Sequence, residues 1–505
     1  FFYFIFLLYY NTLCYVIKSL KRKESVPFFG MEAFEKRKAK MKKRRFQRIG
    51  LLNRGEPAVR FIQAIRDMNR EEGYGFKIIA FYTYPDENSL FTSWADEICL
   101  IGPPQFEDPN DLDEFGKPRR KSSYLNYPFL QQKFQELQIE AVWPGWGFAA
   151  EDPQLVEICE KENILFIGPS SEVMRRLGDK ISSKIIAEKA GAPVTPWSGK
   201  ALESCKEAQE IGRKLGYPLA LKASAGGGGR GIRLVFSEEE LVEVFDSAKS
   251  EALKAFGDDR MFLEKMVPKA RHIEVQIGAD HYGTIHAFGV RDCSVQRRNQ
   301  KIIEEGPSPV LSKDQEERIC QAAVSIAKEA GYTNLGTVEF LLDASTKEVY
   351  FMEMNTRLQV EHPVTEMITG LDLVKLQVKI AMGESLPKEK PSTRGHAIEV
   401  RLNAEDGEQN FAPTPGKVLA FQVPTGPGIR CDTGIREGDM IPMDFDSMVA
   451  KIIGYGATRE EARARLDRAL TESVVLVGDG TADKGYLLEI LRNKEFQEAR
   501  VTTGW

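Results

Sequence analysis

From Ile49 onward, short apolar runs alternate with stretches whose apolar residues recur at helical spacing. IGLLNRGEPAVRFIQAI predicts a strand, a turn and a helix, and KIIAFYTYP and EICLIG predict further strands. FLQQKFQELQIEAVW and PQLVEICEKENILFIGPS each predict a helix followed by a strand. Such alternation is typical of an open parallel sheet, where ligands bind at the carboxyl ends of the strands. The charged, turn-rich stretch PPQFEDPNDLDEFGKPRRKSS predicts a surface insertion.

A second unit begins near Met174. RRLGDKISSKIIAEKAG predicts a helix, and YPLALKAS, AGGGGRG and IRLVFS predict a strand, a loop and a strand. A Walker-type P-loop runs from strand to helix as GxxxxGK[ST], which does not occur here. Glycines between two strands favour a hairpin flap whose backbone N–H groups close over phosphates, although a plain linker is the alternative. Lys222 beside the loop and Lys180 upstream favour the flap.

Residues 349–366, VYFMEMNTRLQVEHPVTE, carry polar side chains at every second position. In an extended strand these would share one face, as the following side chains do: Glu353, Asn355, Arg357, Gln359 and Glu361. Two acids and an amide suit a hard cation such as magnesium. Arg357 offers a planar fork for an anion, and Glu361 could act as a base. The alternative is a solvated strand face with cross-strand ion pairs.

Two further patterns complete the order of elements. GTVEFLLDAS pairs naturally with VYFMEMN across a turn at Ser345, which would bring Glu339 beside Glu353. From Arg394 the chain restarts with the strands GHAIEVRLNAED and PGKVLAFQVP and the helix ATREEARARLDRAL. A third, mixed α and β unit is therefore expected.

Composition excludes several classes of protein. A chain of 505 residues corresponds to about three domains, and 42% apolar with 28% charged residues is ordinary for a globular protein. The net charge of −5 gives no indication of nucleic-acid binding. The cysteines are scattered without a C-x-x-C pair, which argues against a zinc module or disulfide framework. A reducing compartment is expected, namely the cytoplasm, with a mitochondrial or plastid matrix as the alternative.

The first residues, FFYFIFLLYYNTLCYVI, are apolar for most of 17 positions. A membrane span needs about 20 apolar residues, so this stretch is at the short limit. It also lacks the basic start and the cleavage site of a secretory signal. We expect residues 1–45 to be a tail outside the fold, from a translated upstream sequence or a misplaced start, and we expect no membrane anchor.

Five separate motifs resemble the biotin carboxylase family, the ATP-grasp component of biotin-dependent acyl-CoA and pyruvate carboxylases. They are GDK, KASAGGGGRGIR, RDCSVQRRNQK, EMNTRLQVEHPVTE and RLNAED, in the family's order and spacing, and the resemblance covers residues 48–505. It implies an α/β protein with a pre-ATP-grasp open parallel sheet domain at 46–172. An ATP-grasp domain at 173–392, with a glycine-rich flap at about 195–265, and a C-terminal α+β biotin carboxylase domain at 393–505 would follow.

The resemblance also implies roles for individual residues. ATP would be contacted by Lys180, Lys222, Gly228, Gly229, Glu264, Lys265, Met266 and His272. Magnesium or manganese would be held by Glu339, Glu353 and Asn355. Bicarbonate would be placed by Lys301, Arg357, Gln359, Val360 and Glu361, with Glu361 as the base. Biotin would meet Arg401, and the catalytic set would be Lys301, Arg357, Glu361 and Arg401.

The implied activity is that of an ATP-dependent ligase. It would carboxylate biotin with bicarbonate through carboxyphosphate, the first half-reaction of an acetyl-CoA, propionyl-CoA, longer acyl-CoA or pyruvate carboxylase, as in fatty acid biosynthesis. No A-M-K-M segment for biotin attachment occurs in the chain. Biotin would therefore arrive on a carrier domain in trans, with a carboxyltransferase as a further partner, and both would be separate subunits or a part of the polypeptide missing from this sequence. A homodimer is expected, without nucleic acid or membrane.

The sequence departs from the family pattern at several places, including WPGWGFAAED in place of the commoner PGYGFLSEN form. Asn299 stands where the family often has His, Ala225 replaces the first glycine of the loop, and residues 107–120 form an insertion. Two rival functions remain. One is another ATP-grasp ligase, such as an enzyme that forms carbamoyl phosphate, and the other is a non-catalytic regulatory or scaffolding homologue. The carried-over charged residues, all present, argue against the second rival.

Overall fold

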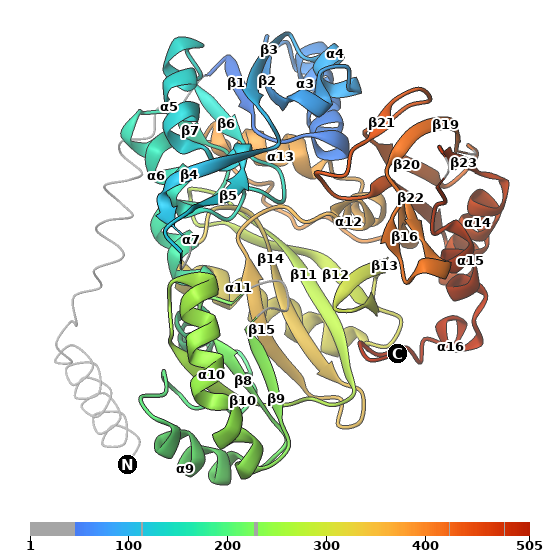
Figure 1. Cartoon of the computed structure of the whole chain (residues 1–505). Helices are drawn as coiled ribbons and strands as arrows, with labels where there is room; N and C mark the ends of the chain where they lie inside the picture. Colours follow the sequence, from blue (N-terminus) through green and yellow to red (C-terminus); the bar gives the residue numbers. More distant parts are fainter. Residues whose placement is uncertain (1–45, 113–114, 227–230, 424, 479) are drawn as a thin grey trace, which may run out of the picture. The chain divides into compact units, whose positions relative to one another are not determined.

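The computed structural model describes residues 46–112, 115–226, 231–423, 425–478 and 480–505 (Figure 1). The predicted tail at 1–45 lies outside the described residues, and so do Gly228 and Gly229 of the predicted flap. None of the helices in the described part of the chain has the length and apolarity that a membrane span requires.

The alternating strands and helices at the start form a parallel sheet in the order β3-β2-β1-β6-β7, which confirms the predicted open sheet. Its strands are β1 (Arg48–Leu51), β2 (Lys77–Thr83), β3 (Glu97–Gly102), β6 (Ala141–Trp143) and β7 (Leu165–Phe166). Its helices are α3 (Gly55–Glu72), α4 (Leu90–Trp94), α5 (Tyr127–Glu136) and α6 (Pro153–Lys161).

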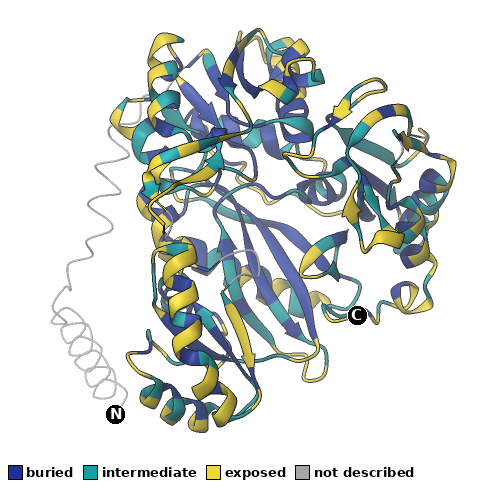
Figure 2. Cartoon of the chain, in the orientation of Figure 1, coloured by how far each residue is buried: buried dark blue, intermediate teal, exposed yellow. Residues whose placement is uncertain are grey.

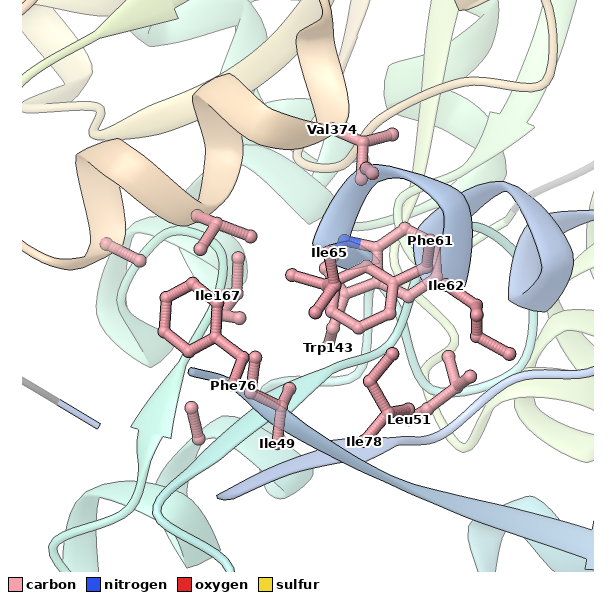
Figure 3. Close-up of a cluster of buried hydrophobic side chains, with 14 of the residues drawn as sticks. Ile49, Leu51, Phe61, Ile62, Ile65, Phe76, Ile78, Trp143, Ile167 and Val374 are labelled. Atoms are coloured by element: carbon pink, nitrogen blue, oxygen red, sulfur yellow. The ribbon is translucent and has the colours of Figure 1, made fainter. Parts of the chain in front are cut away.

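Helix α3 packs its apolar face on this sheet, as Figure 3 shows. The rings of Phe61 on α3 and Trp143 on β6 are stacked, with centroids 4.4 Å apart and planes inclined by 20°. The Trp143 indole donates to Gln377 Oε1 (3.0 Å) on α13 (Leu373–Ala381), so its buried N–H is satisfied. The end of β6 is therefore tied to a later part of the chain.

The predicted surface insertion forms an antiparallel hairpin of β4 (Gln105–Leu112) and β5 (Pro118–Ser122). Most of its residues are exposed or half-buried. Lys121 on β5 pairs with Asp108 on β4 at 2.8 Å. Regular strand pairing thus gives order to a segment that has little apolar surface to bury.

The single helix predicted across GDK is wrong, because Asp179 separates α7 (Ser171–Gly178) from α8 (Lys180–Lys189). Asp179 has an extended backbone and its Oδ1 accepts from the N–H of Ser182 (2.8 Å), so it is the N-cap of α8.

The two strands predicted on either side of the glycine loop are confirmed as β8 (Leu219–Ala223) and β9 (Ile232–Val235), which pair antiparallel. With β10 (Met261–Lys265) they form a sheet in the order β10-β8-β9. Helices α9 (Cys205–Leu215) and α10 (Glu238–Phe256) cover this sheet and share a hydrophobic cluster with it. This hairpin unit has its own core.

The largest sheet runs in the order β15-β14-β11-β12-β13-β16-β22-β20. Its strands are β11 (Ala270–Ala279), β12 (Ile285–Arg297), β13 (Gln300–Gly306), β14 (Asn334–Asp343), β15 (Val349–Asn355), β16 (His396–Asn403), β20 (Ile429–Thr433) and β22 (Met448–Gly456). Figure 2 shows its central strands almost wholly buried, and every residue of β11 is buried. Glu339 lies opposite Glu353 in the register of β14 and β15, as predicted. The sheet continues across the boundary predicted at 392/393.

The strand predicted to run through Glu361 is wrong beyond Asn355, where β15 ends. Asn355 pairs with Thr337, close to the start of β14, so few partner residues are left. The next N–H, that of Thr356, donates to Glu151 Oε1 (3.0 Å) instead of to a strand. The chain then turns and enters α12 (His362–Thr369), whose first turn contains a proline.

The remaining elements include helices that cover this sheet and the short strands of the C-terminal part. Helix α11 (Lys313–Ala330) covers β11 and β12. The C-terminal part adds β17 (Glu405–Asp406), β18 (Ala412–Pro413), β19 (Gly416–Gln422), β21 (Met440–Ile441), β23 (Val474–Val477), α14 (Arg459–Glu472), α15 (Lys484–Arg492) and α16 (Lys494–Gln497). The predicted helix ATREEARARLDRAL corresponds to α14, which packs on β22.

Candidate functional site

A cavity of about 1700 Å³ lies between the glycine hairpin, the large sheet and the loop that follows β15. Most of the predicted site residues line it, namely Lys180, Lys222, Glu264, His272, Lys301, Glu339, Glu353, Asn355, Arg357, Gln359, Val360, Glu361 and Arg401. Lys265 and Met266 are not among its lining residues. The Lys265 ammonium donates to the carbonyl oxygens of Gly216 (2.6 Å) and Tyr217 (3.1 Å).

Lys301 lies at the centre of the acidic end of the cavity. Its ammonium is 2.8 Å from Glu361 Oε1 and 3.0 Å from Glu339 Oε1, and it also contacts Glu274. Burial alone would lower the pKa of Lys301, but the carboxylates around it, Glu274 first, raise that pKa well above its ordinary value. Lys301 is therefore a fixed positive charge.

Glu361 is held between two cations from different strands. Its Oε1 meets Lys301 on β13, and its Oε2 accepts from Arg401 Nη2 (2.9 Å) on β16. Burial would raise the pKa of Glu361, but Lys301 and Arg401 lower it well below its ordinary value. Arg401 is itself oriented by Glu304 Oε1, 2.6 Å from Nη2. Glu361 is thus ionised and aimed into the cavity by charges on both sides.

Arg357 and Gln359 lie in the loop after β15. The guanidinium Nε of Arg357 donates to Glu151 Oε2 (2.8 Å), which lies in the segment between β6 and α6. The Gln359 amide donates to Glu339 Oε1 (2.8 Å). Both side chains therefore line the cavity from a loop, although they were predicted to lie on a continuation of the strand.

The predicted metal ligands lie together at the edge of the large sheet. Asn355 Nδ2 donates to Glu339 Oε1 (2.8 Å), and Glu353 lies opposite Glu339 in the strand register. The Lys180 ammonium lies 2.5 Å from Glu353 Oε2. Two carboxylates and an amide oxygen form a hard donor set of the kind that Mg²⁺ prefers. Their role as ligands stays a prediction.

The other end of the cavity holds Glu264 between two lysines. Its Oε2 lies 2.7 Å from Lys222 and its Oε1 lies 2.9 Å from Lys184. Burial would raise the pKa of Glu264, but Lys222 and Lys184 lower it to about 2. Its carboxylate is engaged with these ammonium groups, and the predicted contact with the adenine amino group stays a prediction.

His272 on β11 lies beside the acidic end. Its Nε2 is 3.1 Å from Glu339 Oε2 and 3.3 Å from Glu274 Oε1. Burial would lower its pKa, but the neighbouring carboxylates Glu339 and Glu274 together outweigh burial and raise the pKa to about 9. The imidazole therefore carries a positive charge at neutral pH.

Several residues that contact the predicted set were missed from the sequence, among them Glu151, Lys184, Glu274 and Glu304. Two of them, Glu274 and Lys184, have a pattern in the sequence that could have indicated them. In RHIEVQIG, His272, Glu274 and Gln276 alternate with apolar residues, so a strand would place them on one polar face. Lys184 follows Lys180 by four residues, which places both on one face of a helix.

Asn299 lies at the turn between β12 and β13. Arg298 and Asn299 have φ of 51° and 64°, so both central residues of this tight hairpin turn are left-handed. Asn is among the residues that tolerate this conformation best. Its side chain lines the cavity, so the departure from His is compatible with the local backbone.

Family models match nearly all of the described chain. "Biotin carboxylase, N-terminal domain" matches residues 45–174, "Carbamoyl-phosphate synthase L chain, ATP binding domain" matches 179–389, and "Biotin carboxylase C-terminal domain" matches 399–505. An open parallel sheet followed by this ATP-binding domain, with lysines and carboxylates lining one cavity, defines an ATP-grasp ligase, which is ATP-dependent. The chain belongs to the biotin carboxylase family.

Known relatives agree with this assignment. Biotin carboxylase of a Nostoc species is 42% identical over 463 residues, which cover 91% of this chain and 98% of the relative. Biotin carboxylase 1 of Bacillus subtilis is 42% identical over 431 residues, which cover 85% of this chain and 91% of the relative. A solved dimer of the biotin carboxylase domain of Hydrogenobacter thermophilus 2-oxoglutarate carboxylase, with MgADP, ADP and bicarbonate, has a TM-score of 0.82. It is 39% identical, covering 91% of this chain and 97% of that one.

Proposed function

We propose that the chain catalyses the ATP- and bicarbonate-dependent carboxylation of biotin on a carrier domain. The observation that carries the proposal is the placement of Glu361 between Lys301 and Arg401 at the acidic end of the cavity. A base between two cations suits a reaction in which an anion must be bound, deprotonated and kept beside a second substrate.

The first step joins bicarbonate to the terminal phosphoryl group of ATP. Lys301 and Arg357 hold the bicarbonate, and Glu361 takes its proton as the new oxygen–phosphorus bond forms. The bond between that phosphorus and ADP breaks, giving carboxyphosphate and ADP. Lys180 and Lys222 offset the charge on the phosphates during the transfer. A magnesium ion held by the carboxylate and amide oxygens at the sheet edge would supply further positive charge there.

The second step moves the carboxyl group to biotin. The carbon–oxygen bond of carboxyphosphate breaks to give carbon dioxide and phosphate, and the phosphate takes the proton from the biotin ureido nitrogen. Arg401 stabilises the negative charge on the ureido oxygen, and the nitrogen then forms its bond to the carbon of carbon dioxide. Arg401 suits this role because it reaches the cavity beside Glu361.

The comparisons favour this function over the rival ligase. The segments on both sides of the ATP-binding domain match biotin carboxylase models, which an enzyme that forms carbamoyl phosphate would not require. We place the chain in the cytoplasm, as a homodimer that works with a biotinyl carrier and a carboxyltransferase. Its final acceptor is an acyl-CoA, pyruvate or another 2-oxo acid.

Replacing the base tests the proposal. Glu361→Gln should abolish the bicarbonate- and biotin-dependent part of ATP turnover, because an amide cannot accept the proton, while ADP binding measured by calorimetry persists. Glu348→Gln, at the exposed turn between β14 and β15, is the matched control and should behave as wild type. Normal bicarbonate-dependent turnover by Glu361→Gln would exclude Glu361 as the base.

A further inference from the structure

Two consecutive backbone carbonyls immediately before Glu361 are held from outside the loop. The carbonyl oxygen of Gln359 lies 2.8 Å from Nδ1 of His362, and that of Val360 accepts from the Lys451 ammonium (2.9 Å). The side chain of Glu361 is held separately by Lys301 and Arg401. The loop is therefore fixed through its backbone as well as through its carboxylate.

Lys451 is unusual because it is a fully buried lysine outside the predicted site. It lies on β22 directly opposite Arg401 on β16, and Figure 1 shows these two strands side by side. Side chains at paired positions of adjacent strands point to the same face. Lys451 and Arg401 thus reach the same short loop from neighbouring strands, one at the Val360 backbone and one at the Glu361 side chain.

The charge of Lys451 is compensated from two directions. Its ammonium lies 3.1 Å from Glu56 Oε1, in the first turn of α3, and 4.7 Å from the ring centroid of Trp146. The Trp146 ring also packs against His362, with centroids 5.1 Å apart. The predicted parallel-sheet domain therefore supplies an acid and an aromatic ring that lock Lys451 in one position.

Burying the Lys451 ammonium carries a free-energy penalty for removing its charge from water, which an apolar residue at this position would avoid. Replacing a buried ion pair by apolar side chains of similar volume is often neutral or stabilising, so stability alone does not account for the pair. An apolar side chain could not donate to the Val360 carbonyl. The contact to the loop is thus what the buried ammonium provides beyond packing.

We propose that Lys451 is a positioning residue for the carboxylation reaction, which fixes the backbone of residues 359–361 so that Glu361 faces bicarbonate. This inference rests on the proposed function. Lys451 acts through the loop and touches neither substrate. Loss of its contact should displace the base relative to Lys301, and a misplacement of about 1 Å can cost on the order of 100-fold in rate.

The test separates a positioning role from a role in stability by comparing two variants, one that removes Lys451 alone and one that removes both Lys451 and Glu56. Lys451→Met leaves Glu56 buried without its partner, so this variant should be less stable and should lose bicarbonate-dependent turnover by on the order of 100-fold. The double variant Glu56→Met with Lys451→Met removes both charges and replaces the pair by apolar side chains of similar volume. It should recover the wild-type melting temperature, but its turnover should stay as low as that of Lys451→Met.

Three measurements on the full chain decide the outcome: the melting temperature, calorimetric ADP binding, and ATP turnover with bicarbonate and free biotin. Low turnover in a double variant that is folded and binds ADP like wild type would support positioning. Recovery of turnover in the double variant, or normal turnover in Lys451→Met, would overturn it. Failure of the wild type itself to show bicarbonate-dependent turnover would instead overturn the proposed function.

Discussion

At the scale of single residues, the basicity of Glu361 depends on what occupies the cavity. Burial would raise the pKa of Glu361, but Lys301 and Arg401 outweigh burial and hold this pKa well below its ordinary value. Without bound bicarbonate the carboxylate is therefore a weak proton acceptor. A bicarbonate anion bound to Lys301 and Arg357 would share their positive charge and thereby raise the basicity of Glu361. Substrate binding would in this way strengthen the base that acts on it.

Glu264 offers a prediction about stability. Because burial is outweighed by Lys222 and Lys184, its pKa falls to about 2, below its ordinary value of 4.5. The contribution of ionised Glu264 to the free energy of unfolding is therefore fully present above about pH 4.5 and is lost as the pH falls through 2. Glu264→Gln should lower the free energy of unfolding at pH 7 by about 3 kcal/mol, measured by urea denaturation.

The same measurement has an internal control. The difference between wild type and Glu264→Gln should be equal at pH 7 and pH 5, since both lie above the titration range. Adding Lys184→Met to Glu264→Gln should recover part of the loss, because one unpaired buried cation is removed. A difference that changes between pH 7 and pH 5 would refute this account of Glu264.

At the scale of elements, the sequence predicted several of the strands and helices near the site, but it ran the strand at 349–355 on through Glu361 and joined α7 to α8. The alternation of polar residues over 353–361 corresponds to a strand only as far as Asn355, where β15 ends. Beyond it the same alternation lies in a loop, because the N–H of Thr356 donates to Glu151 and not to a neighbouring strand. The helical pattern across GDK hides the break at Asp179, whose capping role depends on backbone angles. The end of β15 and the break between α7 and α8 both depend on contacts with segments that are distant along the chain. The spacing of apolar and polar residues carries no information about such contacts.

Asp179 joins α8 to the glycine hairpin. Besides capping α8, its Oδ2 accepts from Ser224 Oγ (2.8 Å), just after β8, and from Arg260 Nη2 (2.7 Å), just before β10. Asp179→Ala should lower the free energy of unfolding by about 1–2 kcal/mol through loss of the cap. It should also raise the apparent KM for ATP, because Lys180 follows Asp179 directly and the hairpin loses an anchor.

Ser170→Ala is the matched control for Asp179. Ser170 caps α7 by accepting from the N–H of Val173, at the end of α7 away from the hairpin contacts of Asp179. This variant should lose stability while the KM for ATP stays at the wild-type value in steady-state assays. Equal effects of the two variants on KM would mean that Asp179 acts only as a helix cap.

At the scale of the whole molecule, the motifs brought nearly all predicted site residues to one cavity, although they lie on many elements. The residues that sequence reasoning missed share one property: each contacts a predicted residue that is distant along the chain. Glu304 orients Arg401 and Glu151 orients Arg357. Their roles exist only after folding, so spacing along the chain could not reveal them.

The carrier is the subject of the last prediction. With no A-M-K-M segment in its sequence, the purified chain should show no label on a streptavidin blot. A biotinylated carrier domain added with ATP and bicarbonate should become carboxylated, as measured with labelled bicarbonate. Arg401→Ala should impair this transfer strongly, because the positive charge that offsets the ureido oxygen is lost.

Arg468→Ala provides the comparison for Arg401. Arg468 lies on α14 and pairs with Glu472 at the surface, so its loss should leave transfer unchanged. Label on the chain itself, or a carrier that stays uncarboxylated while ATP is consumed, would contradict a carrier in trans.

The sheet that continues from β13 into β16 constrains how this protein can change over evolutionary time. Residues 303–306 pair with 397–400 through backbone hydrogen bonds, and the next position of β16 carries Arg401. A recombination event in the connecting segment would have to restore that register to within one residue, since a slip of one residue turns Arg401 to the opposite face. We therefore expect the ATP-binding and C-terminal portions to be exchanged only together, because the position of Arg401 depends on their shared strand register.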